Sequence, residues 1–409
     1  MKKILFPFIF LTVTSVYSQQ TTFTSVFYDL LGSAQGYGVV QSADSNFFIA
    51  GEKDDQALFV KMDPYGINLW GKKYVFAGNS AFFCRIIPTH DSQFILIGSL
   101  DFGYSDGDLL CMKLTASGDT TWTKSIDFGH SEYATYIQET SDHGFILCGT
   151  VDIPGSYNSQ MLVIKLDSAG SLEWATTLSG ATYTAAHSVK EAPDHGFYVT
   201  GGMENSPGWE TMAILVRLTS DGNITWAKRL SSNALYAQGF DVVVTGSGLL
   251  CLVEFTYGTL LIKTDYSGNI IWSKNYSVAS GFTPFEHGQR AKLHPTSDAG
   301  FIFVTTGQFG SMLKVDSTGL IDWSYELFLE SMDVIESLDH GFLIVGNGPI
   351  LGVELYPTDH PQIGLIKTDS LGNTDDCVFP TWWVPDTMTT TFIPVSLTTG
   401  TGWKGAFCP

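Results

Sequence analysis

Short apolar runs separated by polar turns recur along most of the chain. In the third of these blocks, four runs follow one another at 134–139, 145–149, 161–166 and 172–178. Runs of this length that are rich in aliphatic and aromatic residues are typical of β-strands. The turns between them read Asp-His-Gly and Asp-Ser-Ala-Gly, where Asp bonds to its own backbone and Gly accepts a positive φ. The pattern therefore predicts four short antiparallel strands joined by tight turns.

This unit returns seven times at intervals of roughly 50 residues. Its first turn is marked by Asp44, Asp91, Asp142, Asp194, Gly246, Asp298 and Asp339. Its third strand carries a basic residue: Lys61, Lys113, Lys165, Arg217, Lys263, Lys314 and Lys367. Six copies close with Trp70, Trp122, Trp174, Trp226, Trp272 and Trp323. Four antiparallel strands form the blade of a β-propeller, and a blade buries both faces only between two neighbours. We therefore predict an all-β, seven-bladed β-propeller in residues 19–375.

The seventh copy lacks the strand that carries the tryptophan. Residues 369–373 run directly into Thr374 and Asp375, whereas residues 22–30 form a strand-like run that belongs to no copy. Trp122 and Trp174 each precede the next turn aspartate by 20 residues, and the same spacing before Asp44 leads to Thr24. We expect this N-terminal segment to complete the seventh blade, which would leave the ring without an exposed strand edge.

The first residues have the pattern of a secretory signal peptide. Lys2 and Lys3 precede an apolar run over 4–17, and small residues precede a cleavage point after Ser18. The run is shorter than a comfortable membrane span. We therefore expect residues 1–18 to be removed, no transmembrane segment in the mature chain, and a secreted or cell-surface protein.

The repeat resembles a known group of proteins in its G-F-I-x-x-G and L-I-K-x-D-x-x-G-N-x-x-W phrases. These phrases are similar to those of the secreted β-propeller repeat proteins of Bacteroidetes-type bacteria, over residues 22–375. The K-x-D-x-x-G-x-x-x-W phrase also resembles quinoprotein propellers, which are enzymes that bind a quinone and calcium. The chain lacks the adjacent cysteines found in many of them, so the resemblance implies a shared scaffold without the cofactor site.

The net charge indicates which binding partners are disfavoured, and the positions of the cysteines indicate which of them form a disulfide. The formal net charge is −20 at pH 7, which disfavours nucleic acid and anionic membranes. Four cysteines take apolar positions of the repeat and are expected to be buried thiols. The other two, Cys377 and Cys408, lie in a C-terminal tail of residues 376–409. Because export leads to an oxidising compartment, we expect them to form a disulfide.

Comparison of the copies separates scaffold residues from residues that are free to bind a ligand. The tryptophans recur and are expected to be core, and the basic residues are expected to pack between blades with their charged groups paired. His143, His195 and His340 share one turn position on separate blades, so they are expected to be turn residues and not one metal cluster. The sequence assigns no catalytic residue, cofactor or metal ligand.

The variable connections point to the binding surface. Turns after strands one and three are short and alike, whereas connections after strands two and four, on the opposite face, vary most. The predicted ligand-binding residues are Phe102, Tyr104, Tyr157, Trp209, Tyr356, Asp106, Asp108 and Glu210. Aromatic faces beside carboxylates suit sugar rings and protein interfaces. We predict a monomeric, extracytoplasmic binding or structural scaffold for a glycan or an extracellular protein; the alternative is a carbohydrate-active hydrolase or lyase.

Overall fold

The structure is a computed structural model. It describes residues 21–27, 33–76, 78–101, 107–153, 158–180, 183–204, 211–231, 237–255, 258–277, 291–305, 310–327, 329–348, 362–374, 378–380, 385–386, 391–394, 398–400 and 406–408. Every regular element in these ranges is a β-strand. No helix among them has the length and apolar character needed to cross a membrane.

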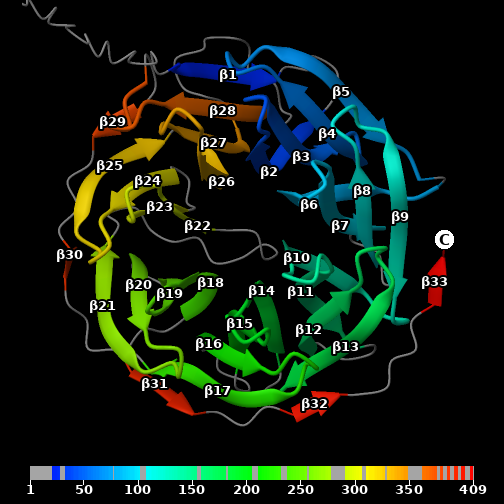
Figure 1. The fold of residues 1–409 in the computed structure, drawn as a ribbon, viewed down its shortest axis with the longest axis vertical. Coiled ribbons are helices and arrows are strands. Elements are labelled where there is room, and N and C mark those ends of the chain that lie inside the picture. The colour runs from blue at the N-terminus through cyan, green and yellow to red at the C-terminus, as the bar shows by residue number, and fades with distance from the viewer. Residues whose placement is uncertain are drawn as a thin grey trace, which may run out of the picture.

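The strands form antiparallel groups of four that are arranged around a common centre (Figure 1). The first two groups are β2 (Ala34–Gln41), β3 (Phe47–Lys53), β4 (Gln56–Met62) and β5 (Asn68–Tyr74), then β6 (Ala81–Pro88), β7 (Phe94–Leu100), β8 (Asp108–Leu114) and β9 (Thr120–Asp127). Next come β10 (Glu132–Glu139), β11 (Phe145–Asp152), β12 (Ser159–Leu166) and β13 (Leu172–Ser179), then β14 (Tyr183–Glu191), β15 (Phe197–Glu204), β16 (Thr211–Leu218) and β17 (Ile224–Ser231).

The remaining groups follow the same plan. They are β18 (Ala237–Thr245), β19 (Gly248–Phe255), β20 (Gly258–Thr264) and β21 (Ile270–Ser277), then β22 (Lys292–Pro295), β23 (Phe301–Thr305), β24 (Gly310–Val315) and β25 (Ile321–Leu327), and last β26 (Glu330–Glu336), β27 (Phe342–Asn347) and β28 (Ile363–Thr368). The first strand of each group lies nearest the centre and the fourth lies at the rim (Figure 1). The predicted all-β fold of four-stranded antiparallel units is confirmed.

The last group takes its fourth strand from the other end of the chain. β1 (Phe23–Phe27) pairs antiparallel with β28, with Phe23 opposite Lys367 and Phe27 opposite Ile363. The predicted strand at 22–30 is therefore present over Phe23–Phe27, and residues 28–30 lie outside the described ranges.

Apolar side chains of neighbouring groups pack into shared clusters. One cluster joins Ile97 and Cys111 of the β6–β9 group to Ile137 and Ile164 of the β10–β13 group. Six of the groups bear a bulge on their first strand, such as the one between Phe83 and Arg85, which bends the strand and re-aims the residues after it. Each group thus buries its faces against its neighbours, as the repeat predicts.

Four cysteines in these clusters are free and buried: Cys84, Cys111, Cys148 and Cys251. Burial raises the pKa of each thiol to about 12, so the reactive thiolate is disfavoured. The prediction that these four cysteines are buried thiols is confirmed.

The C-terminal tail adds short strands outside the fourth strands of successive groups (Figure 1). β29 (Val378–Pro380), β30 (Pro385–Asp386), β31 (Thr391–Pro394), β32 (Thr398–Gly400) and β33 (Ala406–Cys408) pair with β25, β21, β17, β13 and β9, respectively. The sequence did not predict this arrangement. Cys377 lies outside the described residues, so the disulfide between Cys377 and Cys408 stays a prediction.

Candidate functional site

One face of the molecule carries the turns after the first and third strands, such as 140–144 and 167–171, and is called the turn face below. On this face the repeated third-strand cation meets the turn aspartate. Lys165 Nζ lies 2.9 Å from an Asp142 carboxylate oxygen, and Lys367 Nζ lies 2.9 Å from Asp339. The other pairs are Lys61 with Asp44, Lys113 with Asp91, Arg217 with Asp194, and Lys314 with Asp298. The predicted pairing of these cations is confirmed in six copies.

The fifth copy departs from this pattern for a clear reason. Its turn has no aspartate at this position, and Lys263 Nζ donates to the Thr245 hydroxyl instead. Burial lowers the pKa of Lys263.

The turn histidines join neighbouring groups. His143, His195 and His340 each have φ 63°, which confirms their interpretation as turn residues. His195 Nδ1 lies 3.0 Å from Glu191 Oε1 and 2.9 Å from the Ser141 hydroxyl of the preceding group. His340, Glu336 and Ser297 repeat this arrangement. These contacts connect adjacent groups at the turn face and are a scaffold feature.

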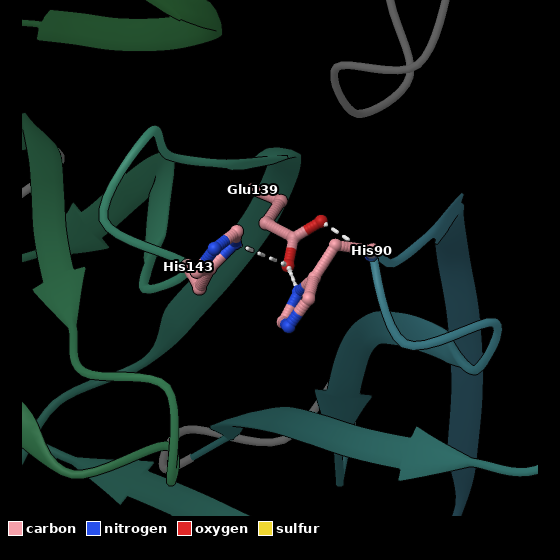
Figure 2. Close-up of side chains that lie close together, drawn as sticks. All are labelled: His90, Glu139 and His143. Atoms are coloured by element: carbon pink, nitrogen blue, oxygen red, sulfur yellow. Dashed lines mark hydrogen bonds and ion pairs between the residues drawn. The ribbon is translucent and has the colours of Figure 1, made fainter.

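His90 occupies the serine position at a third such junction (Figure 2). Its Nδ1 lies 2.5 Å from Glu139 Oε1, and Glu139 Oε1 also lies 3.9 Å from His143 Nδ1. Although two imidazoles and a carboxylate are metal ligands, the His90 and His143 rings are stacked with centroids 3.8 Å apart and planes 27° apart. Because His90 takes the place of Ser141 and Ser297 in the two other junctions, we assign this trio to the same contact between groups.

The closing tryptophans also serve contacts between groups. A Cβ atom on Gly170 would lie 2.9 Å from the Trp122 ring, and φ there is 76°, so only glycine suits the turn. Trp174 Nε1 donates to Ser220 O of the next group at 3.1 Å. The tryptophans are half-buried and pack across the junctions, so the expectation that they are core residues holds only in part.

A second set of polar residues gathers at the centre, on the first strands. The position after each bulge holds Gly38, Arg85, Tyr136, Ser188, Asp241 and Asp333, and Lys292 takes the corresponding place in β22. Arg85 Nη1 contacts Asp333 Oδ1 at 2.9 Å, and Ser188 Oγ donates to Asp241 Oδ1 at 2.6 Å. Arg85, Tyr136, Lys190, Asp241, Lys292 and Asp333 are called the central cluster below.

The central cluster brings three cations, two carboxylates and the Tyr136 ring into contact. The guanidinium of Arg85 and the ammonium of Lys190 lie 4.9 and 4.3 Å from the Tyr136 ring centroid. Burial opposes ionisation of Asp241, but the neighbouring cations, Lys190 first, hold its pKa below the usual value. Backbone N–H groups also donate to both of its acids, that of Leu293 to Asp241 and that of Val39 to Asp333. We interpret the cluster as a buried network that ties the inner strands together.

The opposite face, called the variable-loop face, carries the connections after the second and fourth strands, such as 54–55 and 128–131. Of the predicted ligand-binding residues only Asp108 is described; Phe102, Tyr104, Asp106, Tyr157, Trp209, Glu210 and Tyr356 lie outside the described residues. Asp108 lies beside two acids that the sequence analysis missed, Asp127 and Glu132, with one oxygen of each within 4.8 Å of the others. The sequence did offer one signal for Asp127 and Glu132: other copies carry no acid at the equivalent positions.

The chain matches no model of a protein family, and no curated protein matches it. Among solved structures it is similar to a catalytically inactive virginiamycin B lyase from Staphylococcus aureus with quinupristin, at 12% identity and a TM-score of 0.51, over 85% of this chain and 99% of that chain. It is also similar to the Dos1 propeller, at 12% identity and a TM-score of 0.47, over 87% of this chain and 95% of that one. A protein of unknown function from Bacteroides caccae matches at 11% identity and a TM-score of 0.42, over 72% and 94%. The neighbours are β-propeller proteins, and at such identities the first likeness shows the fold alone.

Proposed function

We propose that the chain is an exported binding or structural scaffold, a seven-bladed β-propeller closed by β1, which recognises a glycan or an extracellular protein through its variable-loop face. The observation that carries this proposal is the difference between the two faces. On the turn face the repeated residues are engaged in ion pairs and in contacts between adjacent groups, such as Lys165 with Asp142 and Ser141 with Glu191. In the sequence, the connections that vary most between copies are those after the second and fourth strands.

The central cluster supports a scaffold over an enzyme. Its two carboxylates, Asp241 and Asp333, are buried, with exposed fractions of 1% and 2%, and both accept bonds from cations, hydroxyls or backbone N–H groups. A hydrolase needs an acid and a base that can reach a substrate in a cleft. Carboxylates that are buried and hydrogen-bonded in this way can hold the inner strands together, but they are poorly placed to transfer a proton to a ligand.

The proposed binding residues are those of the sequence analysis. Phe102, Tyr104, Tyr157, Trp209 and Tyr356 supply aromatic faces, and Asp106, Asp108 and Glu210 supply hydrogen-bond acceptors beside them. Aromatic rings with nearby carboxylates match the apolar faces and hydroxyl groups of sugars, and tyrosine and tryptophan are frequent anchors of protein interfaces.

A binding screen tests the proposal. The mature protein is offered to a glycan array and to extracellular proteins, and any ligand is then titrated against the Trp209→Ala/Tyr104→Ala double variant. Tyr65→Ala is the matched control, because Tyr65 is 66% exposed in a turn of the opposite face. We expect the double variant to lose roughly tenfold or more in affinity with an unchanged melting temperature, and the control to bind like the parent.

Two results would overturn this account. A loss of affinity in Tyr65→Ala, with full affinity in the double variant, would move the site to the turn face. Conversion of a bound glycan into new reducing ends or unsaturated products would establish the alternative, a propeller-fold carbohydrate-active hydrolase or lyase. Recovery of the glycan unchanged after prolonged incubation supports the scaffold.

A further inference from the structure

Three acidic residues meet at the junction between the β6–β9 group and the β10–β13 group. Asp108 begins β8, Asp127 ends β9 and Glu132 begins β10, so three different strands supply them. One carboxylate oxygen of each lies within 4.8 Å of the others. We call Asp108, Asp127 and Glu132 the acidic trio.

The scaffold does not require these acids. The position of Glu132, fixed by the pairing of first and second strands, holds Ala34, Ala81, Thr184, Ala237 and Leu329 in other groups. The position of Asp108 holds Gln56, Gln160, Met212, Gly258 and Gln362, and that of Asp127 holds Val75, Ser179, Ser231 and Ser277. Among the described copies, three acids coincide at this one junction.

Glu132 is the member that points to a ligand. Its side chain is 0% exposed, and neither carboxylate oxygen has a hydrogen-bond partner. The carboxylates of Asp127 and Asp108 add two negative charges close to it, and the backbone amides of Phe128 and His130 also lie near it. A buried carboxylate whose oxygens lack hydrogen-bond partners destabilises the folded state unless another group or ion compensates its charge.

The other two acids are held in position by their neighbours. Ser125 Oγ donates to Asp108 Oδ2 at 2.7 Å, and the Gly129 N–H donates to Asp127 Oδ1 at 2.5 Å. The Glu132 N–H donates to Gly107 O at 2.7 Å, which fixes the start of β10 against the residue before Asp108. The three carboxylates are thus placed before any ligand arrives, which reduces the entropy lost on binding.

We propose that the acidic trio binds one divalent cation, with calcium preferred. Carboxylate oxygens are the donors that calcium takes, and it accepts six to eight of them in a flexible geometry, whereas magnesium demands a stricter octahedron and keeps more water. A cation here relieves both the burial of Glu132 and the repulsion among three negative charges. The site goes beyond the proposed scaffold function and does not depend on it.

Calorimetry of calcium binding to the mature protein, after removal of metals with EDTA and dialysis, tests the proposal. We expect one calcium ion per chain, with a Kd in the micromolar to millimolar range of roughly 10⁻⁶–10⁻³ M, and weaker binding of magnesium. Glu132→Gln and Asp127→Asn should each weaken calcium binding tenfold or more. Asp55→Asn is the control, because it removes an exposed acid far from the trio in the sequence and should leave the Kd unchanged.

Thermal unfolding gives a readout that does not depend on calorimetry. Calcium should raise the melting temperature of the parent protein, because the cation binds only the folded chain. Glu132→Ala, which installs the residue of three other groups, should fold, melt in EDTA at or above the parent's temperature, and lose the response to calcium. No saturable binding of calcium up to several millimolar, or equal affinity in Glu132→Gln, Asp127→Asn and the parent, would overturn the site.

Discussion

Phe23 lies opposite Lys367 in the pairing of β1 with β28, although the two residues stand near opposite ends of the chain. This is the register in which Trp70 faces Lys61 and Trp174 faces Lys165. A Cβ atom on Gly66 would lie 2.6 Å from the Phe23 ring, just as the turn glycines of other groups lie against a tryptophan. Phe23 therefore takes the place of the missing seventh tryptophan.

Removal of the Phe23 phenyl ring should weaken the packing between the last group of strands and the first. We expect Phe23→Ala to lower the free energy of unfolding by about 1–3 kcal/mol, because its contacts with Phe47 and with the turn at Gly66 are lost. Phe23→Trp should be tolerated better than Phe23→Ala. Urea unfolding measures both, and equal stability of Phe23→Ala and the parent would contradict the role given to this ring.

The repeated ion pair should matter where its cation is buried. Lys367 is 1% exposed and meets both oxygens of Asp339, at 2.9 and 3.1 Å. Because Asp339→Asn leaves this ammonium buried without a carboxylate, we expect a loss of about 2–4 kcal/mol in urea unfolding. Lys263→Met is the control, since Lys263 has no carboxylate partner, and its loss should be below about 1 kcal/mol. Similar losses of unfolding free energy in Asp339→Asn and Lys263→Met would show that the Lys367–Asp339 ion pair does not stabilise the fold.

Acid should unfold the protein through the turn aspartates. Burial alone would raise the pKa of Asp298, but hydrogen bonds from Lys314 and Thr296 lower it from 3.8 to about 2. A folded-state pKa below the unfolded value contributes stability above pH 3.8 that is lost as the pH falls through 2. Asp91 and Asp142 behave alike. We expect the free energy of unfolding to fall steeply from pH 4 to 2, and less steeply in Asp298→Asn; an equal slope would contradict this origin.

Glu52 should act in the opposite direction. Burial, with the charge of Asp55, raises its pKa from 4.5 to about 7. The folded state therefore keeps a proton that the unfolded state releases, so this group's stabilisation is present below pH 4.5 and is lost as the pH rises through 7. We expect Glu52→Gln to melt near the parent's temperature at pH 4.5 and above it at pH 8. A temperature difference that does not change with pH would rule out this contribution.

The sequence determined the four-strand unit because each unit repeats its own turn chemistry and strand pattern. The first strand of the third copy was predicted too short: the run at 134–139 is part of β10, which spans Glu132–Glu139. Glu132 is polar and does not look like a strand residue, but it pairs with Val151 because the register of the two strands continues to that point. The sequence spacing predicted Thr24 at the position that Phe23 occupies. A count of residues between two marks is shifted by one whenever a connection is one residue longer or shorter. The strands of the tail were not predicted. They pair with the outer edges of fourth strands through backbone hydrogen bonds, so their sequences need not follow the repeat.

The candidate sites were predicted less well, for a physical reason. Asp108 was chosen as a blade-specific acid, but its neighbours Asp127 and Glu132 become visible only when three strands meet. The central cluster depends on bulges, which rotate Arg85 and Asp333 toward each other across residues far apart in sequence. A pattern of single positions contains neither of these contacts.

The central claim is that seven blades form a ring closed by the N-terminal strand, and deletion of residues 19–30 tests it most directly. Size-exclusion chromatography with light scattering and a thermal melt compare the truncated and mature chains, and a synthetic peptide of residues 19–30 is then added to the truncated one. We predict aggregation or a large drop in melting temperature, because the deletion exposes the edge of β28, and partial rescue by the peptide but not by its Phe23→Ala version. A truncated chain that stays monomeric with the melting temperature of the mature protein would contradict the closed ring.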